Sequence, residues 1–136
     1  MNQGRPDIVR RDERGTPVAV VEIKWSARPK DRDFLLRQLG EYVRAVGSAR
    51  YSILVNPVDI EVFEGDPSEH HSWKISTTDV LERYDQHYRE RHNVNEGYLS
   101  TLITAWLDDL SYHATQGRKP EEDRLPKGLL DALRAA

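Results

Sequence analysis

The chain has 136 residues and a formal net charge of −3, with 38% hydrophobic and 32% charged residues. This length and composition are typical of one folded domain with its own core, not of a disordered segment. The absence of cysteine excludes disulfides, thiolate zinc sites and cysteine nucleophiles. No apolar run approaches the roughly 18 residues of a membrane span and no signal peptide opens the sequence, so we expect a soluble, cytoplasmic protein without a membrane partner.

Charge is distributed unevenly along the chain. Residues 1–50 carry 11 Lys and Arg against 7 Asp and Glu, whereas residues 51–136 carry 9 against 16. The chain as a whole is therefore not a generally basic nucleic-acid binder, and the first part is the side on which a polyanion would be tolerated.

Two strands are expected first. Asp7–Arg11 reads as a strand that starts after a proline, and Asp12–Thr16 has turn chemistry. The run Val18–Trp25 is apolar on both faces, which is typical of a central strand in a sheet covered by helices. Glu22 and Lys24 are two residues apart and share a face of that strand.

Burying an unpaired charge costs several kcal/mol, so this pair indicates a partner, a metal or a catalytic task. The alternative is an edge strand that twists into solvent and carries a surface ion pair. The hairpin register tests these readings. A turn centred between Arg14 and Gly15 pairs residues whose numbers sum to 29, which places Asp7 opposite Glu22. Two opposed carboxylates repel each other unless a cation lies between them.

The next elements follow from periodicity and capping residues. After a basic loop, Ser26–Arg32, we expect a helix over Phe34–Val46 that brings Gln38 and Tyr42 to one face. A strand at Tyr51–Val55 should then lie parallel to Val18–Trp25, because a helical crossover joins them. Ile60–Phe63 is expected to be an edge strand, followed by a loop at Gly65–Ser72.

The remainder is expected to be helical. One helix should run from Thr77 or Thr78 to about His92, and a second should start after Asn95 with an apolar stripe over Leu99–Leu110 and end at Gly117. A short last helix begins near Pro126. The fold class is thus α/β, with a mixed sheet of about four strands in residues 1–73 and a helical C-terminal extension in residues 74–136, packed together as one domain.

The polar residues, taken in chain order, resemble the motifs of the PD-(D/E)xK nuclease superfamily. Pro6-Asp7 resembles its first motif, Glu22-Ile23-Lys24 its second, and Gln38-x-x-x-Tyr42 the helix motif of its RecB-like branch. The stretch from Arg5 to Phe63 is also similar to the nuclease modules of type I restriction motor subunits. The resemblance covers residues 5 to about 64 and implies a restriction-endonuclease-like core.

The resemblance implies a metal-dependent deoxyribonuclease in host defence or DNA processing, using Mg²⁺ with Mn²⁺ as a substitute. Asp7, Glu22 and the Ile23 carbonyl would bind the metal, and Lys24 would orient or deprotonate the water and stabilise the developing charge. Gln38 would hold the nucleophile or a phosphate. Further contacts with DNA are expected from Arg5, Arg10, Trp25, Arg28, Lys30 and Tyr42. From the residues alone, Gln38 is also compatible with an exposed helix position and Tyr42 with a core aromatic.

One departure from the family concerns the start of the chain. The family core begins with a helix and a strand before the Pro-Asp motif, so we expect an N-terminally truncated core, completed by a homodimer partner, a larger complex or the C-terminal helices. Two alternatives to a nuclease stay open: a catalytically degenerate module that binds DNA or scaffolds a complex, and an assembly protein that dimerises through the Leu99–Leu110 stripe. His70 and His71 are adjacent and lie in a loop, which is a poor arrangement for a metal site.

Overall fold

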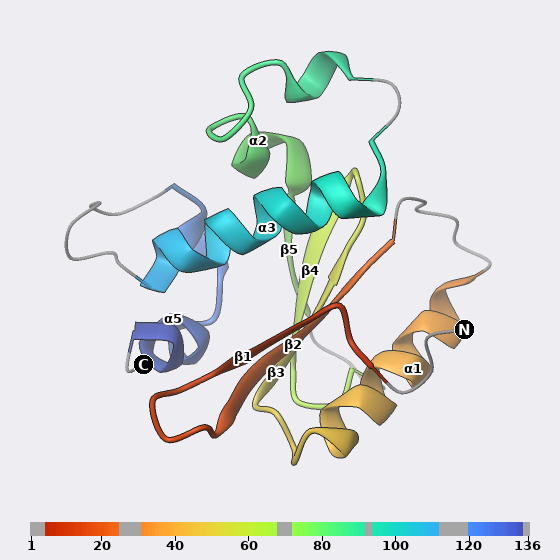
Figure 1. The fold of residues 1–136 in the computed structure, drawn as a ribbon, viewed down its shortest axis with the longest axis vertical. Helices are drawn as coiled ribbons and strands as arrows, with labels where there is room; N and C mark the ends of the chain where they lie inside the picture. The colour runs from red at the N-terminus through yellow and green to blue at the C-terminus, as the bar shows by residue number, and fades with distance from the viewer. Residues whose placement is uncertain (1–4, 25–30, 68–71, 92–93, 112–119, 135–136) are drawn as a thin grey trace.

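The computed structural model describes residues 5–24, 31–67, 72–91, 94–111 and 120–134 (Figure 1). These residues form a mixed α/β fold around one five-stranded sheet. Within them, no helix is long and apolar enough to cross a membrane.

The strands lie in the sheet in the same order as in the sequence, β1-β2-β3-β4-β5. Their bounds are β1 Ile8–Arg11, β2 Pro17–Ile23, β3 Tyr51–Val55, β4 Asp59–Glu64 and β5 Ser72–Ser76. β2 and β3 pair in parallel, as predicted from the helix between them, and the other three neighbouring pairs are antiparallel. Every residue of β2 is buried, so the alternative of a solvent-exposed edge strand is wrong.

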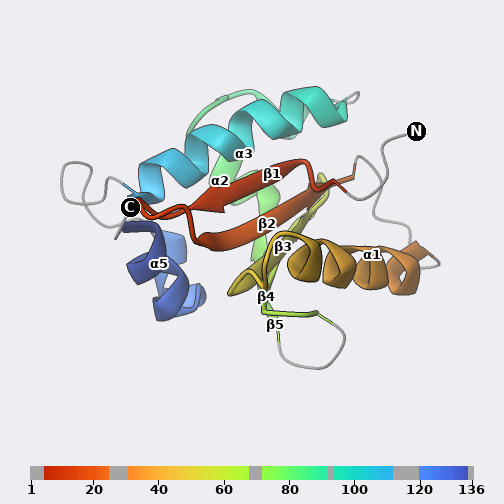
Figure 2. The same ribbon diagram turned by 60° about the horizontal axis from the view of Figure 1, so that its bottom comes forward.

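Helix α1 (Arg32–Ala45) covers one face of the sheet (Figure 2). It packs Leu39, Tyr42 and Val43 against Val20 and Leu54 of β2 and β3. The helix ends before Gly47, whose φ of +101° is the left-handed conformation that glycine adopts at helix ends. The helix predicted over Phe34–Val46 is therefore present.

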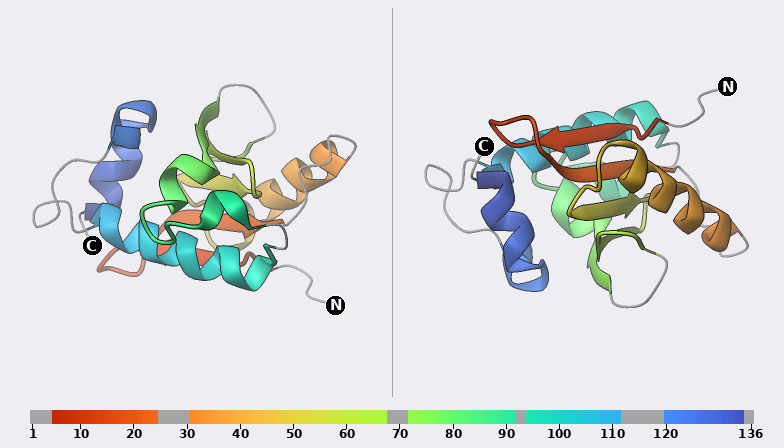
Figure 3. Two further views of the ribbon diagram at one scale, coloured as in Figure 1. Left: turned by 90° about the horizontal axis from the view of Figure 1, so that it is seen from above. Right: turned by 90° about the horizontal axis from the view of Figure 1, so that it is seen from below.

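The opposite face carries the larger core. It is covered by α2 (Thr77–Leu81), α3 (Glu96–Ser111) and α5 (Lys127–Arg134), with the short 3₁₀ turns η2 (Tyr88–Glu90) and η3 (Pro120–Arg124). Figure 3 shows α5 at the other end of the molecule from α1. Asn95 caps α3 as expected, because its Oδ1 accepts the Tyr98 N–H at 2.8 Å.

The apolar stripe of α3 faces this core. Its residues are all buried within the chain, namely Leu99, Leu102, Ile103, Trp106, Leu107 and Leu110. The stripe is therefore not an exposed surface for dimerisation, and the assembly reading that depended on it loses its support.

Two expectations for the segment after β4 are wrong. Ser72–Ser76 forms β5 against β4, so β4 is an interior strand and the helical part begins after Ser76 instead of at residue 74. Its five residues (Ser-Trp-Lys-Ile-Ser) alternate polar and apolar as a strand does, but they run directly into a helix at Thr77, so no turn residue marks the end of the strand.

The helix expected from Thr77 to His92 is also much shorter, since α2 ends at Leu81. The chain turns at Asp85, four residues after the end of α2, and the Asp85 carboxylate accepts hydrogen bonds from the His87 N–H at 3.0 Å and from Arg91 and Tyr98. An aspartate that bonds to nearby backbone N–H groups favours a turn over a continued helix. Position 92 and Gly117 lie outside the described residues.

Candidate active site

The hairpin brings Asp7 to the end of β2. Ile8, Val9 and Arg10 pair with Val21, Val20 and Ala19, so the predicted register, in which the numbers sum to 29, is confirmed for these three pairs. Just beyond them the Asp7 N–H donates to the Val21 carbonyl at 3.0 Å, and Asp7 Oδ2 accepts the Ile23 N–H at 2.7 Å. The Asp7 carboxylate is therefore tied to the backbone of the residue between Glu22 and Lys24.

Glu22 is buried beside Asp7. Its exposed fraction is 3%, and it faces α1 together with Val20 because side chains alternate along a strand. Burial raises the pKa of Glu22 to about 8, with further contributions from its hydrogen bond with Asp7 and from the Asp7 charge; Lys24 opposes these effects. At pH 7, without a cation, Glu22 would thus keep its proton.

Lys24 completes the polar group at this end of the sheet. Its Nζ lies 3.4 Å from Glu22 Oε2, and its side chain is 33% exposed. The Lys24 N–H donates to the Val55 carbonyl at 2.8 Å, which extends the β2–β3 pairing by one residue and holds the backbone in place. The ammonium group therefore lies between a buried carboxyl group and solvent.

Helix α1 contributes Gln38 and Tyr42 one turn apart. Tyr42 is 2% exposed and belongs to the core under α1, so the core-aromatic interpretation holds. It also lies near the acidic pair, because burial raises its pKa and the charges of Glu22 and Asp7 raise it further. Among the described residues the Gln38 Oε1 atom is buried and has no hydrogen-bond partner. A buried amide oxygen without a donor indicates that a water or a ligand donates to it, or that a cation binds it.

Of the other predicted DNA contacts, Arg10 lies away from this site. Arg10 points to the opposite face of the sheet, where its Nη1 lies 2.7 Å from Asp108 Oδ1 of α3. Arg5 is exposed, whereas Trp25, Arg28 and Lys30 lie outside the described residues. The role of the Ile23 carbonyl stays a prediction.

A second buried carboxylate, which the sequence analysis missed, lies on the same face. Glu61 of β4 is 4% exposed, and its two oxygens accept hydrogen bonds from Arg32 Nη1 and Nη2 at 2.7 and 2.8 Å. Ser72 Oγ donates to the same carboxylate at 2.8 Å. The signal in the sequence was a charge between Ile60 and Val62, and it was not recognised because β4 was taken for an edge strand.

A divalent cation fits the chemistry of the Asp7–Glu22 pair. Within the described part of the chain no three His, Cys, Asp or Glu side chains form a metal-binding group. Mg²⁺ nevertheless keeps several waters and is commonly held by one or two carboxylates. A pair of adjacent carboxyl groups, one of them with a raised pKa, is relieved by a cation that replaces the proton.

Comparisons with known proteins assign neither a family nor a function to this site. No family model, no curated protein and no solved structure matches the chain. Any function must therefore be argued from the residues of the site.

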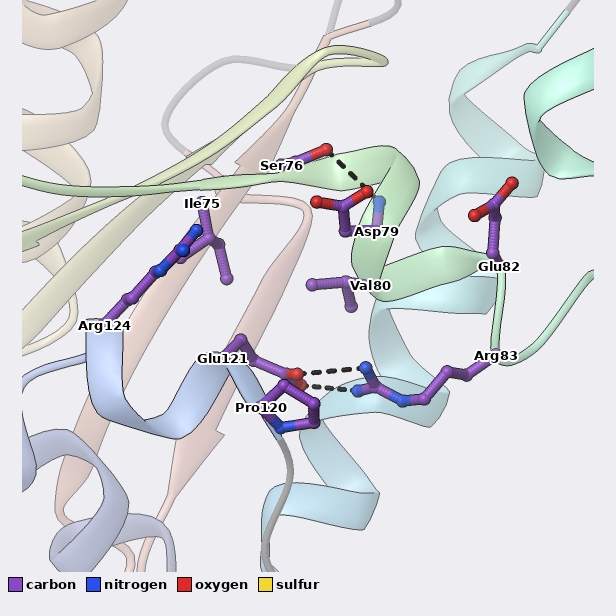
Figure 4. Close-up of a pocket in the computed structure, with 9 residues that line it drawn as sticks. All are labelled: Ile75, Ser76, Asp79, Val80, Glu82, Arg83, Pro120, Glu121 and Arg124. Atoms are coloured by element: carbon purple, nitrogen blue, oxygen red, sulfur yellow. Dashed lines mark hydrogen bonds and ion pairs between the residues drawn. The ribbon is translucent and has the colours of Figure 1, made fainter.

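A separate pocket of about 390 Å³ lies between β5, α2 and η3 (Figure 4). Ile75 lines it, and Ile75 belongs to the core on the face opposite Glu22. Figure 4 shows the Arg83 guanidinium bonded twice to Glu121, and Glu121 also accepts the Trp106 indole N–H at 2.8 Å. These contacts tie η3 to the turn after α2 and to α3, and the pocket lies on the other side of the sheet from the acidic site.

Proposed function

We propose that the protein is a metal-dependent deoxyribonuclease that hydrolyses phosphodiester bonds at Asp7, Glu22 and Lys24. The observation that carries the proposal is the buried Glu22 carboxyl group, in contact with both a second carboxylate and an ammonium group at the end of an interior strand. A structural role alone would be served better by apolar residues, since burying such charges is costly.

Each residue of the site has a chemical task in this proposal. Asp7 and Glu22 hold Mg²⁺, which when bound would lower the pKa of water and neutralise charge on the phosphate. Lys24 places its positive charge where negative charge develops on the phosphate oxygens, which stabilises the transition state more than the ground state. The Gln38 amide oxygen accepts a hydrogen bond from the attacking water and orients it, whereas Tyr42 forms the wall of the site.

The test compares Glu22→Gln with Glu64→Gln, a matched change at the exposed end of β4. We expect the wild type and Glu64→Gln to bind Mg²⁺ or Mn²⁺ in a calorimetric titration and to cleave duplex or single-stranded DNA, with cleavage abolished by EDTA. Glu22→Gln should lose both properties while retaining the folded state in circular dichroism.

The second candidate function is a catalytically degenerate module of the same fold that binds DNA or scaffolds a complex. It is favoured by the proton that the acidic pair would hold at neutral pH, since a site that keeps its proton does not need a metal. A wild type that binds DNA but neither takes up Mg²⁺ or Mn²⁺ nor cuts any DNA form would replace the nuclease proposal with this one.

A further inference from the structure

The row of residues across the face under α1 contains a second polar group. Glu22 of β2 and Glu61 of β4 both lie opposite Leu54 of β3, and Lys74 of β5 lies opposite Glu61. Opposed residues in neighbouring strands share a face, and strands are about 4.8 Å apart, so Glu22 and Glu61 are separated by about 10 Å along the sheet. The two carboxyl groups therefore lie on one face of the sheet, with the buried Leu54 between them.

Glu61 has an unusual partner for a buried carboxylate. Its side chain is 6% exposed, whereas that of the Arg32 to which it is bonded is 44% exposed. Burial alone would raise the pKa of Glu61, but the hydrogen bonds from Arg32 and Ser72 and the charges of Arg32 and Lys74 lower it, so it is ionised. The buried acid thus holds an exposed guanidinium in a fixed orientation through two parallel hydrogen bonds.

Two cationic side chains belong to this group. Arg32 and the exposed Lys74 both interact with Glu61, and the charges of Asp33 and Asp59 also act on Arg32. Each terminal nitrogen of Arg32 uses one N–H for Glu61, and a guanidinium carries two on each, so donors remain for a second anion. A fixed guanidinium with free donors and a neighbouring ammonium suits a phosphate group.

We propose that Arg32 and Lys74 bind a phosphate of the DNA strand that is being cut, within a few nucleotides of the bond at Asp7 and Glu22, and that Glu61 is the positioning residue for Arg32. This inference rests on the proposed function. It assigns the acidic pair to the reacting phosphate and the Arg32–Lys74 group to a neighbouring one, so that the strand runs from the end of β2 past Arg32, at the start of α1, towards Lys74 of β5. Contacts of this kind set the register of the strand and carry no base specificity.

The test separates binding from chemistry. Lys74→Ala is an exposed change with little expected effect on folding, and Lys127→Ala, at the exposed start of α5, is its control. Binding of a fluorescent oligonucleotide is measured by anisotropy between 50 and 300 mM salt, and cleavage is measured under the same conditions. We expect Lys74→Ala to raise Kd and KM about three- to tenfold with kcat unchanged, and to reduce the slope of log Kd against log salt by about 0.7–0.9, as for one lost phosphate contact.

Arg32 requires a different variant, because removing it alone leaves Glu61 buried without its partner. The double variant Arg32→Gln/Glu61→Gln removes both charges and keeps polar groups in place. We expect a loss of affinity at least as large as that of Lys74→Ala, again with kcat retained, whereas Glu61→Gln alone should weaken binding through the loosened Arg32. Thermal unfolding of each variant, followed by circular dichroism, confirms that the measured chains are folded.

The outcomes distinguish the two proposals. If the wild type cuts DNA but Lys74→Ala and the double variant bind with unchanged Kd and salt slope, the phosphate site is refuted and the nuclease stands. If the wild type does not cut but binds DNA in a manner that depends on Arg32 and Lys74, the phosphate site is supported and the nuclease is refuted. A wild type that neither binds nor cuts DNA overturns both.

Discussion

The raised pKa of Glu22 predicts that its replacement stabilises the protein at alkaline pH. In the unfolded chain this carboxyl group loses its proton near 4.5, whereas in the folded chain it does so near 8. The folded state therefore binds the proton more tightly. The stability that Glu22 contributes is complete below pH 4.5 and is lost as the pH rises to 8 and beyond.

The size of the effect follows from the shift. Each pKa unit corresponds to about 1.4 kcal/mol, so the free energy of unfolding should fall by roughly 4 kcal/mol between pH 4.5 and 8 through this group alone. Glu22→Gln cannot ionise, and its amide can still donate to the Asp7 carboxylate. We expect the two proteins to have similar stability at pH 5, and the variant to be more stable by an amount that grows towards about 4 kcal/mol at pH 8.

Urea unfolding in EDTA at pH 5, 6, 7 and 8 measures this difference, and subtracting the two proteins removes the titration of other groups. Mg²⁺ should narrow the difference at pH 8. At 10 mM and with a Kd of about 1 mM, it would stabilise the wild type by about 1.4 kcal/mol and leave Glu22→Gln unchanged. A difference between the two proteins that does not vary with pH would refute the buried acidic pair, and equal stabilisation by Mg²⁺ would refute its role as the metal site.

Three further predictions concern single side chains. Lys24→Met should lower kcat at least a hundredfold while DNA affinity changes little, as measured by single-turnover cleavage and anisotropy; unchanged turnover would remove Lys24 from the chemistry. Gly128→Ala should destabilise the chain by about 1–3 kcal/mol in urea, because its Cβ would collide with the Tyr51 hydroxyl, and Tyr51→Phe should recover part of that loss if the collision is the cause. Glu121→Ala should cost about 2–3 kcal/mol by leaving Arg83 without its partner, and a melting temperature equal to that of the wild type would contradict this.

Much of the candidate site could be inferred from local rules. The turn at Arg14–Gly15 sets the pairing of β1 with β2, and alternation along a strand then places Asp7, Glu22 and Lys24 on one face. The same alternation shows that Arg10, three residues after Asp7, faces the other way. That conclusion was available from the sequence, although Arg10 was grouped with the DNA contacts.

The sequence by itself thus determined the hairpin register, the parallel β2–β3 pair and the helices whose apolar residues recur every three or four positions, because each depends on a turn, a cap or a short period. Only the tertiary structure decided that β5 covers β4, since five half-polar residues become a strand through the partner that they pair with. The same pairing buries Glu61 and brings it to Arg32, 29 residues earlier in the chain. Which charges meet across a sheet depends on the order of its strands, and that order is a property of the packed chain.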